Sequence, residues 1–287
     1  MYEHKKVRSV NDLPLNHNKI TADTLKSCRR QLFKKMRKVS EKNYRYYIPW
    51  AEENTANTVY PCSIAEGFQS GDIYVNDGEN PESVFFWHHC GFGYISGKAS
   101  DAFMNDIYSE MISMQRGRRL VLITADDDVT AFFHKKDVQT DLRIEYSFFH
   151  PKYTAAMDTG RFLIEEIDTD NLSKIEGRII PSFSWKSPDQ FLKKGFGYIA
   201  LDRGKVCAVV FSAAVSSDKI DIGVETREEY RRNGLASILT SKMCERIVEI
   251  GKKPVLSHSA SNAGSMNTAL KCGFVRDRIN TVIRKKD

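Results

Sequence analysis

The 287-residue sequence lacks the long apolar stretch that a membrane-spanning helix requires. No run approaches the roughly 18 consecutive apolar residues of a membrane span, and residues 1–10, MYEHKKVRSV, carry charge without the apolar core of a signal peptide. We therefore expect a cytoplasmic protein without a membrane partner. A chain of this length is expected to form about two domains, each able to bury a hydrophobic core without disulfides or metals.

The sequence also lacks the cysteine and histidine spacings of a disulfide framework or a metal site. Six cysteines are scattered along the chain: Cys28, Cys62, Cys90, Cys207, Cys244 and Cys272. They form no C-x-x-C pair, so buried reduced thiols are expected. His88 and His89 precede Cys90, but neighbouring residues of a strand point to opposite faces and cannot chelate one ion together. We therefore predict no metal site.

The common nucleotide-binding motifs are absent as well, because neither G-x-x-x-x-G-K-[ST] nor G-x-G-x-x-G occurs. The net charge is +6, and much of the excess lies in residues 26–45. Apolar residues recur there every three or four positions, which predicts an amphipathic helix with a basic face: Leu25, Cys28, Leu32, Met36 and Val39. A solvated face is the simpler interpretation. Binding of RNA, DNA or an acidic partner is the alternative, and the absence of an aromatic-rich nucleic-acid motif weakens it.

Strand-like and helix-like segments alternate along the rest of the chain, which predicts an α/β fold. In the first half, residues 71–78, 82–96, 118–127 and 142–151 read as strands, and residues 101–115 as a helix. In the second half we expect helices over residues 168–175, 187–195, 234–250 and 261–273. Strands are expected over residues 161–167, 196–201, 205–215, 219–226 and 254–260, and residues 274–285 are expected to close the sheet. Pro151 marks the expected seam between domains 1–150 and 151–287.

The word GFGYI occurs at residues 91–95 and 195–199, which raises the question of a duplication. Aligning the predicted hairpin turns instead places GDIYVNDG (71–78) against GYIALDRG (197–204). In this alignment the first GFGYI matches DIGVE (221–225) and not the second GFGYI. Read this way, the halves are two divergent copies of one α/β unit.

A loop at residues 228–237, EEYRRNGLAS, joins a predicted strand that ends at Val224 or Glu225 to a predicted helix that begins near Gly234. The amides of a first helical turn lack intrahelical partners, so several N–H groups can converge on one anion. Gly234 allows a phosphate to approach the backbone, and Arg231 supplies a formal positive charge. The stretch therefore predicts a phosphate cradle.

Two motifs in this half resemble the signature of the GNAT superfamily of N-acetyltransferases. The family pattern [QR]-x-x-G-x-[GA] stands here at residues 231–236, and N-x-x-[SA] followed by G-F matches at Asn262, Ser265, Gly273 and Phe274. The resemblance covers residues 160–287 and implies a mixed, mostly antiparallel GNAT-type central sheet flanked by helices, with two GNAT-like halves in tandem. The first half shares only the layout, since ISGKASDAF (95–103) has no pyrophosphate signature, so it looks like a degenerate GNAT-like domain or a family-specific partner domain.

The resemblance implies acetyl-CoA, or another acyl-CoA, as co-substrate. Its pyrophosphate is expected on the amides of residues 232–237, and its pantetheine arm along the strand that ends near Val224. Asn262 is expected to contact the pantetheine or the splayed strand, and Ser265 to bond the cofactor or cap its helix locally. The expected cofactor-binding residues are Val224, Arg231, Arg232, Asn233, Gly234, Leu235, Ala236, Ser237, Asn262 and Ser265.

In proteins that this chain resembles, the acceptor amine attacks the thioester directly and a carboxylate removes its proton. Glu225 is the candidate base, because it lies at the strand end nearest the expected thioester; a solvated residue at a strand terminus is the alternative. His258 is a second candidate, either as a proton relay or as a hydrogen-bonded core histidine. Asp221 is a third, weaker choice.

One position departs from the pattern of the family that the chain resembles. Many GNAT enzymes place a tyrosine seven residues after the motif asparagine, where it can protonate the departing thiolate, and this sequence has Ala269 there. Thr268 adjoins the position but is expected to point elsewhere on the helix. Tyr198 or Tyr153 could reach the site from other elements, so no general acid is assigned.

The resemblance implies acetyl transfer from acetyl-CoA to a primary amine of a small metabolite, an antibiotic or a protein. A chain with net positive charge does not suit cationic acceptors unless its glutamates gather at the cleft: Glu165, Glu166, Glu225, Glu228 and Glu229. The alternatives are a non-catalytic acyl-CoA-binding regulatory module, favoured by the missing tyrosine, and a nucleic-acid-associated protein that uses residues 26–45.

Overall fold

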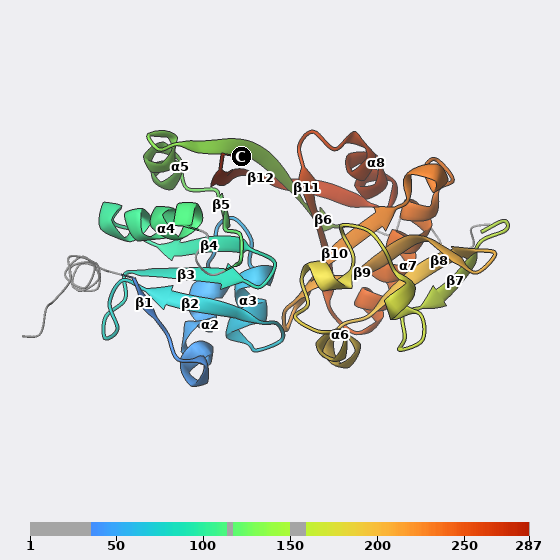
Figure 1. Cartoon of the computed structure of the whole chain (residues 1–287), viewed down its shortest axis with the longest axis horizontal. Helices are drawn as coiled ribbons and strands as arrows, with labels where there is room; N and C mark the ends of the chain where they lie inside the picture. Colours follow the sequence, from blue (N-terminus) through green and yellow to red (C-terminus); the bar gives the residue numbers. More distant parts are fainter. Residues whose placement is uncertain (1–35, 114–116, 150–158, 287) are drawn as a thin grey trace, which may run out of the picture. The chain divides into compact units, whose positions relative to one another are not determined.

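The computed structural model describes residues 36–113, 117–149 and 159–286. These residues form one 12-stranded sheet with helices packed against it (Figure 1). The strands are β1 (Arg37–Lys38), β2 (Gly71–Val75), β3 (Ser83–His88), β4 (Phe92–Gly97), β5 (Val121–Thr124), β6 (Val138–Phe148), β7 (Leu163–Glu166), β8 (Gly197–Asp202), β9 (Lys205–Val215), β10 (Lys219–Thr226), β11 (Lys253–Ser259) and β12 (Phe274–Lys285).

The same residues contain seven α-helices and four short 3-10 helices. The α-helices are α2 (Ile48–Glu52), α3 (Val59–Ala65), α4 (Asp101–Ser113), α5 (Asp127–His134), α6 (Pro188–Lys194), α7 (Leu235–Glu249) and α8 (Ala263–Lys271). The 3-10 helices are η1 (Glu41–Tyr47), η2 (Leu172–Lys174), η3 (Pro181–Phe183) and η4 (Glu228–Tyr230). In the part of the chain that is described, no helix combines the length and the apolar character needed to cross a bilayer.

The predicted fold class is confirmed, because the sheet is mixed and mostly antiparallel. Its strand order is β1-β2-β3-β4-β5-β12-β6-β11-β10-β9-β8-β7. Among the described strands, only β4 with β5 and β10 with β11 pair in parallel. Each parallel pair is joined through a crossover helix, α4 in the first half and α7 in the second.

The two halves repeat one order of elements. In each half, three antiparallel strands lead into a long helix, a parallel strand, a second helix and a last strand: β2-β3-β4-α4-β5-α5-β6 and β8-β9-β10-α7-β11-α8-β12. β2 therefore corresponds to β8, and β4 to β10, in agreement with the alignment of the hairpin turns. The repeat lies in the topology, while the shared word GFGYI falls on elements that do not correspond.

The last strands of the two halves change places, a feature that the sequence pattern did not reveal. β12 lies between β5 and β6, and β6 lies between β12 and β11, so each half pairs with the last strand of the other. Figure 1 shows β6 and β12 side by side between the two sets of strands. The prediction that residues 274–285 close the sheet is therefore wrong, because β12 has neighbours on both edges. The predicted boundary at residue 150 lies outside the described residues and stays a prediction.

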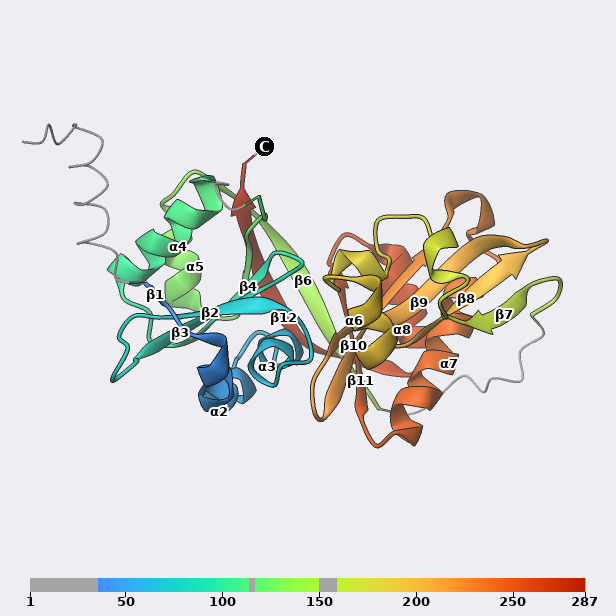
Figure 2. The same ribbon diagram turned by 60° about the horizontal axis from the view of Figure 1, so that its bottom comes forward.

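Helices cover both faces of the first-half strands (Figure 2). Tyr74, Phe85 and Trp87 face α4 and α5, whereas Ile73 and Phe86 face α2 and α3, as the two-residue period of a strand requires. In the second half, α7 presents one apolar stripe to the sheet at four-residue spacing: Leu235, Leu239, Met243 and Ile247. The helix ends just before Gly251, which has a φ of 75°.

Two predicted helices differ from the structure. The predicted basic helix lies outside the described residues over 26–35, but Arg37–Lys38 forms β1 beside β2, so the prediction is wrong at that end. Residues 168–175 form only the 3-10 turn η2. The carboxylate of Asp168 accepts the amides of Asp170 and Asn171, which closes a local turn before a longer helix can start.

Gln69 joins the halves where β9 extends beyond its neighbour β8. The side chain is buried; its Nε2 donates to the carbonyl of Ala213 (3.0 Å), and its Oε1 accepts the amide of Val215 (3.1 Å). Gln69→Leu leaves both backbone groups buried without a partner, so we expect the free energy of unfolding in urea to fall by about 1–3 kcal/mol. Gln139→Leu, at a half-buried position on β6, is the control and should change it by no more than about 0.5 kcal/mol. Equal losses in the two variants would contradict this role.

Candidate functional site

A gap opens in the sheet where β10 and β11 diverge. The two strands pair in parallel only over Lys219 to Asp221, whereas β10 stays paired with β9 as far as Thr226. The backbone of residues 222–226 therefore has a free edge toward β11. Backbone N–H and C=O groups on such an edge can pair with the amides of an extended ligand.

The loop that follows β10 builds the predicted anion cradle. Gly234 is the N-cap of α7 with a φ of 77°, and a Cβ atom placed on it would meet nothing within 4 Å. The first-turn amides of residues 235–237 have no intrahelical acceptor, and Gly234 has no side chain to cap them. Arg232 also has a positive φ, 67°, which turns the chain sharply before the helix. The space over the glycine is open to an anion.

A pocket of about 660 Å³, here called the outer pocket, extends from this cradle. It is lined by Arg178, Ile179, Val224, Glu225, Thr226, Tyr230, Arg231, Arg232, Gly234, Leu235, Ala236, Ser237, Asn262, Gly264, Ser265, Asn267, Thr268 and Lys271. Four of these side chains are cationic and one is a carboxylate. The outer pocket thus suits a polyanion.

The outer pocket gathers nine of the ten residues predicted to bind a cofactor; Asn233 is not among its lining residues. The side-chain amide of Asn233 donates to the carbonyl of Tyr230 (3.0 Å), which shapes the loop instead. Leu235 is buried in the core, so only its backbone faces the cradle. The oxygen of the Asn262 side chain accepts the amide of Ser265 (3.0 Å) and caps α8, which gives the motif asparagine a structural role.

A second cavity of about 220 Å³, the inner pocket, continues from the outer pocket through the gap between β10 and β11. The two share Arg178, Ile179, Val224, Asn262 and Ser265. Both halves of the chain line the inner pocket. The first half contributes Tyr60, Phe92 and Arg143, and the second contributes Phe183, Ala213, Asp221, Ile222, Gly223, Leu256, Ser257, His258 and Ser259.

Asp221 is the buried carboxyl group of the inner pocket. It is 2% exposed, and the hydroxyl of Ser257 lies 3.1 Å from its Oδ2. Burial raises the pKa of Asp221 from its usual 3.8 to about 7, while Arg143 and Ser257 act in the opposite direction. Arg143 is held beside it by hydrogen bonds to the carbonyl and the hydroxyl of Ser257 (3.1 and 2.7 Å). A carboxyl group with this pKa can exchange a proton near neutral pH.

His258 lies on β11 and also faces the inner pocket. Its ring stacks on Tyr146 with centroids 5.0 Å apart, and its Nδ1 is 2.8 Å from the carbonyl of Ser259. Since a carbonyl only accepts, Nδ1 carries the proton and Nε2 is the acceptor in the neutral ring. Burial lowers the pKa of His258, and the described residues offer its Nε2 no hydrogen-bond partner.

The carboxylate of Glu225 has backbone partners. It accepts the amide of Arg178 (2.9 Å) and the neighbouring amide of Ile179, and it lines the outer pocket but not the inner one. A Cβ atom on Gly177 would lie 3.1 Å from this carboxylate. Glu225 therefore holds the 177–179 segment against β10.

The position of the missing tyrosine faces the core. Ala269 is fully buried among apolar side chains, and the adjacent Thr268 lines the outer pocket, contrary to expectation. The hydroxyl of Thr268 donates to the carbonyl of Gly264 (3.0 Å). Tyr198 lines neither pocket, and Tyr153 lies outside the described residues. Tyr60, which sequence reasoning missed because it belongs to the other half, lines the inner pocket.

The side chains of His88 and Cys90 are in contact, although neighbouring His88 and His89 were the pair considered from the sequence. His88 ends β3 and Cys90 stands in the following turn, so the Nδ1 of His88 comes within 3.2 Å of the sulfur. Burial lowers the pKa of His88 to about 3 and raises that of Cys90 to about 12. Within the ranges that the structure describes, no three His, Cys, Asp or Glu residues are grouped so that they could hold a metal ion.

Comparison with known proteins relates this arrangement to one family. Residues 50–283 match the family described as GNAT acetyltransferase. The uncharacterized N-acetyltransferase YdfB of Bacillus subtilis (strain 168) is 25% identical over 222 residues, which cover 74% of this chain and 84% of that protein.

Solved structures share the fold. A GCN5-related N-acetyltransferase-like protein from Streptococcus suis 89/1591 has a TM-score of 0.67 at 20% identity, over 86% of this chain and 100% of its own. A tandem GNAT protein from the clavulanic acid biosynthesis pathway has a TM-score of 0.59 at 8% identity, over 86% of this chain and 96% of its own. At these identities the likeness concerns the fold alone.

The cradle can be tested with two glycines in the same left-handed conformation, which strains any residue that has a Cβ atom. Gly234 and Gly204 have φ values of 77° and 80°, and neither has an atom within 4 Å of an added Cβ. Alanine at either position should lower the free energy of unfolding by about 1–2 kcal/mol. For acetyl-CoA, the ligand predicted from the sequence, we expect only Gly234→Ala to weaken binding in calorimetry, by about tenfold or more, because only its Cβ enters the cradle. Unchanged affinity in Gly234→Ala would place the anion elsewhere.

Proposed function

The chain belongs to the GNAT acetyltransferase family, so acyl transfer is its general chemistry, and we propose that it moves an acetyl group from acetyl-CoA to a primary amine. The observation that carries the proposal is the continuous path from the cradle of α7, past the free edge of β10, to the buried Asp221. A donor that is anionic at one end and reactive at the other fits this path.

The donor would lie with its phosphates in the outer pocket. The amides of residues 235–237 and the cations Arg231, Arg232 and Lys271 would hold the pyrophosphate and neighbouring phosphate. The amide groups of the pantetheine arm would pair with the free edge of residues 222–226. The thioester would then lie at the inner pocket, where β10 and β11 part.

Asp221 is the base that the geometry favours. It lies inside the inner pocket, whereas the carboxylate of Glu225 accepts two backbone amides. A base with a pKa near the working pH combines a useful fraction of the ionised form with a strong affinity for the proton. His258 offers a neutral Nε2 as a relay in the same pocket. We therefore rank Asp221 first, His258 second and Glu225 third.

The proposed reaction is a direct displacement at the acetyl carbon. The neutral amine attacks the carbonyl, a C–N bond forms, and the C–S bond breaks with its electron pair going to sulfur. The proton that the nitrogen loses passes to Asp221 and from there to solvent. Because a thiol has a pKa of about 8.5, the CoA sulfur can leave as a thiolate near neutral pH without a tyrosine at position 269.

Asp221→Asn tests the base. In the wild type, kcat/KM for CoA release, expressed per neutral amine because only that form attacks, should fall as the pH drops below about 7, because protonation removes the base. The variant should lose that limb of the pH profile, with a rate about 10²–10⁴-fold lower at pH 8. Acetyl-CoA affinity should be retained, because Asp221 lies outside the outer pocket.

Glu225→Gln and a stability measurement serve as controls for Asp221→Asn. In Glu225→Gln, kcat/KM should still fall below about pH 7, even if its value is lower at every pH. If this fall disappears in Glu225→Gln, Glu225 is the base. Since folding raises the pKa of Asp221, the wild type should lose stability relative to Asp221→Asn as the pH rises from about 4 to about 7. Acetyl-CoA binding without CoA release across a broad amine panel would favour the non-catalytic module.

A further inference from the structure

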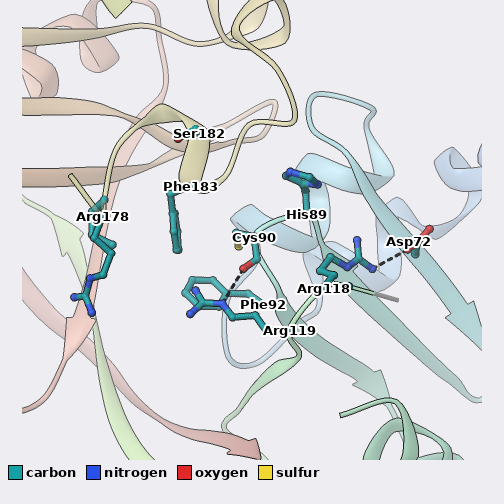
Figure 3. Close-up of a pocket in the computed structure, with 11 residues that line it drawn as sticks. Asp72, His89, Cys90, Phe92, Arg118, Arg119, Arg178, Ser182 and Phe183 are labelled. Carbon is teal, nitrogen blue, oxygen red and sulfur yellow. Dashed lines mark hydrogen bonds and ion pairs between the residues drawn. The ribbon is translucent and has the colours of Figure 1, made fainter. Parts of the chain in front are cut away.

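A third cavity, the arginine pocket, opens beside the inner pocket and has a volume of about 830 Å³. The turn between β3 and β4, the segment before β5 and the 178–183 segment of the second half surround it. In Figure 3, Arg178 lies on one side of it and Arg118 and Arg119 on the other, with Phe183 between them. The pocket therefore presents guanidinium groups from both halves of the chain.

The cationic charge of the arginine pocket exceeds its anionic charge. Its one lining carboxylate, Asp72, is already paired with Lys38 (2.6 Å) and with Arg118 (2.7 Å). Arg119 donates from its Nε to the carbonyl of Cys90 (3.3 Å), and in the described residues neither Arg119 nor Arg178 takes part in an ion pair with a carboxylate. Two guanidinium groups are thus available to an anion.

The arginine pocket borders the inner pocket more extensively than it borders the outer pocket. It shares Phe92, Arg178, Ile179 and Phe183 with the inner pocket, but only Arg178 and Ile179 with the outer pocket. A donor whose phosphates occupy the outer pocket would leave Arg119 without an anionic partner, because Arg119 does not line that pocket. A molecule that enters from the arginine pocket would reach the inner pocket past Phe92 and Phe183, neither of which lines the outer pocket.

Aromatic rings form the passage between the two cavities. Phe92 and Phe183 meet edge to face with centroids 5.8 Å apart, and both line the arginine and inner pockets. The guanidinium of Arg119 lies 5.7 Å from the Phe183 ring, and that of Arg143 lies 5.1 Å from the Phe92 ring. The passage suits an apolar spacer between two polar ends.

We propose that the acceptor amine carries an anionic oxygen group, a carboxylate or a phosphate, which binds Arg119 and Arg178 while its amino group reaches the inner pocket. This inference rests on the proposed function. Arg178 lines all three cavities, and its backbone amide donates to the carboxylate of Glu225, which holds it in place. Arg143 adds positive charge at the inner end.

The glutamates that would favour a cationic acceptor do not gather at this path. Glu165 and Glu166 lie on β7 at the edge of the sheet, and Glu229 pairs with Lys205 (3.1 Å). Glu225 is the one member of the predicted group that lines any of the three pockets, and it holds backbone amides. In the arginine pocket a polyamine or aminoglycoside would therefore meet three arginines and one carboxylate, Asp72, which is already paired.

The kinetic test uses acceptors in matched pairs that differ only in the anionic group. L-phenylalanine is compared with phenylalaninamide, phosphoethanolamine with ethanolamine, and spermidine is the cationic reference. We expect the anionic member of at least one pair to have a kcat/KM for CoA release at least tenfold higher, and the better pair identifies carboxylate or phosphate. Equal values within both pairs, or a preference for spermidine, would overturn the proposal.

Arg119→Gln is the informative variant, because Arg119 lines the arginine pocket and not the outer pocket. It should lower kcat/KM for the anionic acceptor about 10- to 100-fold while leaving the KM for acetyl-CoA unchanged. Arg284→Gln, on β12 and ion-paired with Asp141 (2.8 Å), is the matched control and should change neither value. A similar loss in both arginine variants would contradict a specific anion site.

A binding measurement separates this inference from the proposed function. With CoA saturating the outer pocket, calorimetry measures the binding of hydrocinnamate and of phenyl phosphate to the wild type and to Arg119→Gln. We expect one of the two to bind, and its affinity to fall about tenfold or more in the variant. If neither hydrocinnamate nor phenyl phosphate binds, the inference is overturned, even if amines are acetylated. Binding without acetylation of any amine would support the anion site and reject acyl transfer.

Discussion

The antiparallel pairing of β6 with β12 is the interaction on which the rest of the structure depends. It runs from Phe274 opposite Phe148 to Lys285 opposite Val138, and each strand also pairs with the sheet of the other half. The hydrogen bonds that complete one half are thus supplied by the chain of the other half. Neither set of strands has its full complement of partners alone, and one sheet results.

This exchange also determines what surrounds the reaction site. β6 belongs to the first half by sequence but lies against β11, where Arg143 pairs in register with Ser259 and donates to Ser257. The guanidinium of Arg143 therefore lies beside Asp221, whose pKa is raised by burial. The first half thus contributes Tyr60, Phe92 and Arg143 to the inner pocket, which we propose as the acceptor side of the site. Its role in the proposed mechanism is to supply charge and shape.

Sequence reasoning predicted the elements whose formation depends on near neighbours. The loop at 228–237 and the starts of α7 after Gly234 and of α8 near Asn262 lie where their patterns indicate. The cap that the Asn262 side chain forms on α8 was not predicted, because Ser265 was the expected capping residue. Sequence reasoning also missed α5, although Asp126 caps that helix through the amides of Asp128 and Val129. It ranked Asp221 last because burial, which raises its pKa, cannot be read from a strand that alternates regularly. The hydrogen bonds of the Glu225 carboxylate could not be predicted either, since the amides that it accepts lie 46 and 47 residues away in the sequence.

The sequence by itself determined the α/β order of elements, the repeat of that order, the cradle and the family, because hydrophobic period, turn chemistry and short motifs are properties of adjacent residues. The tertiary structure alone decided which last strand completes which half, and so which residues meet at the inner and arginine pockets. Such choices depend on hydrogen bonds and burial between segments more than 100 residues apart. A local pattern contains no information on which distant edge a strand will join.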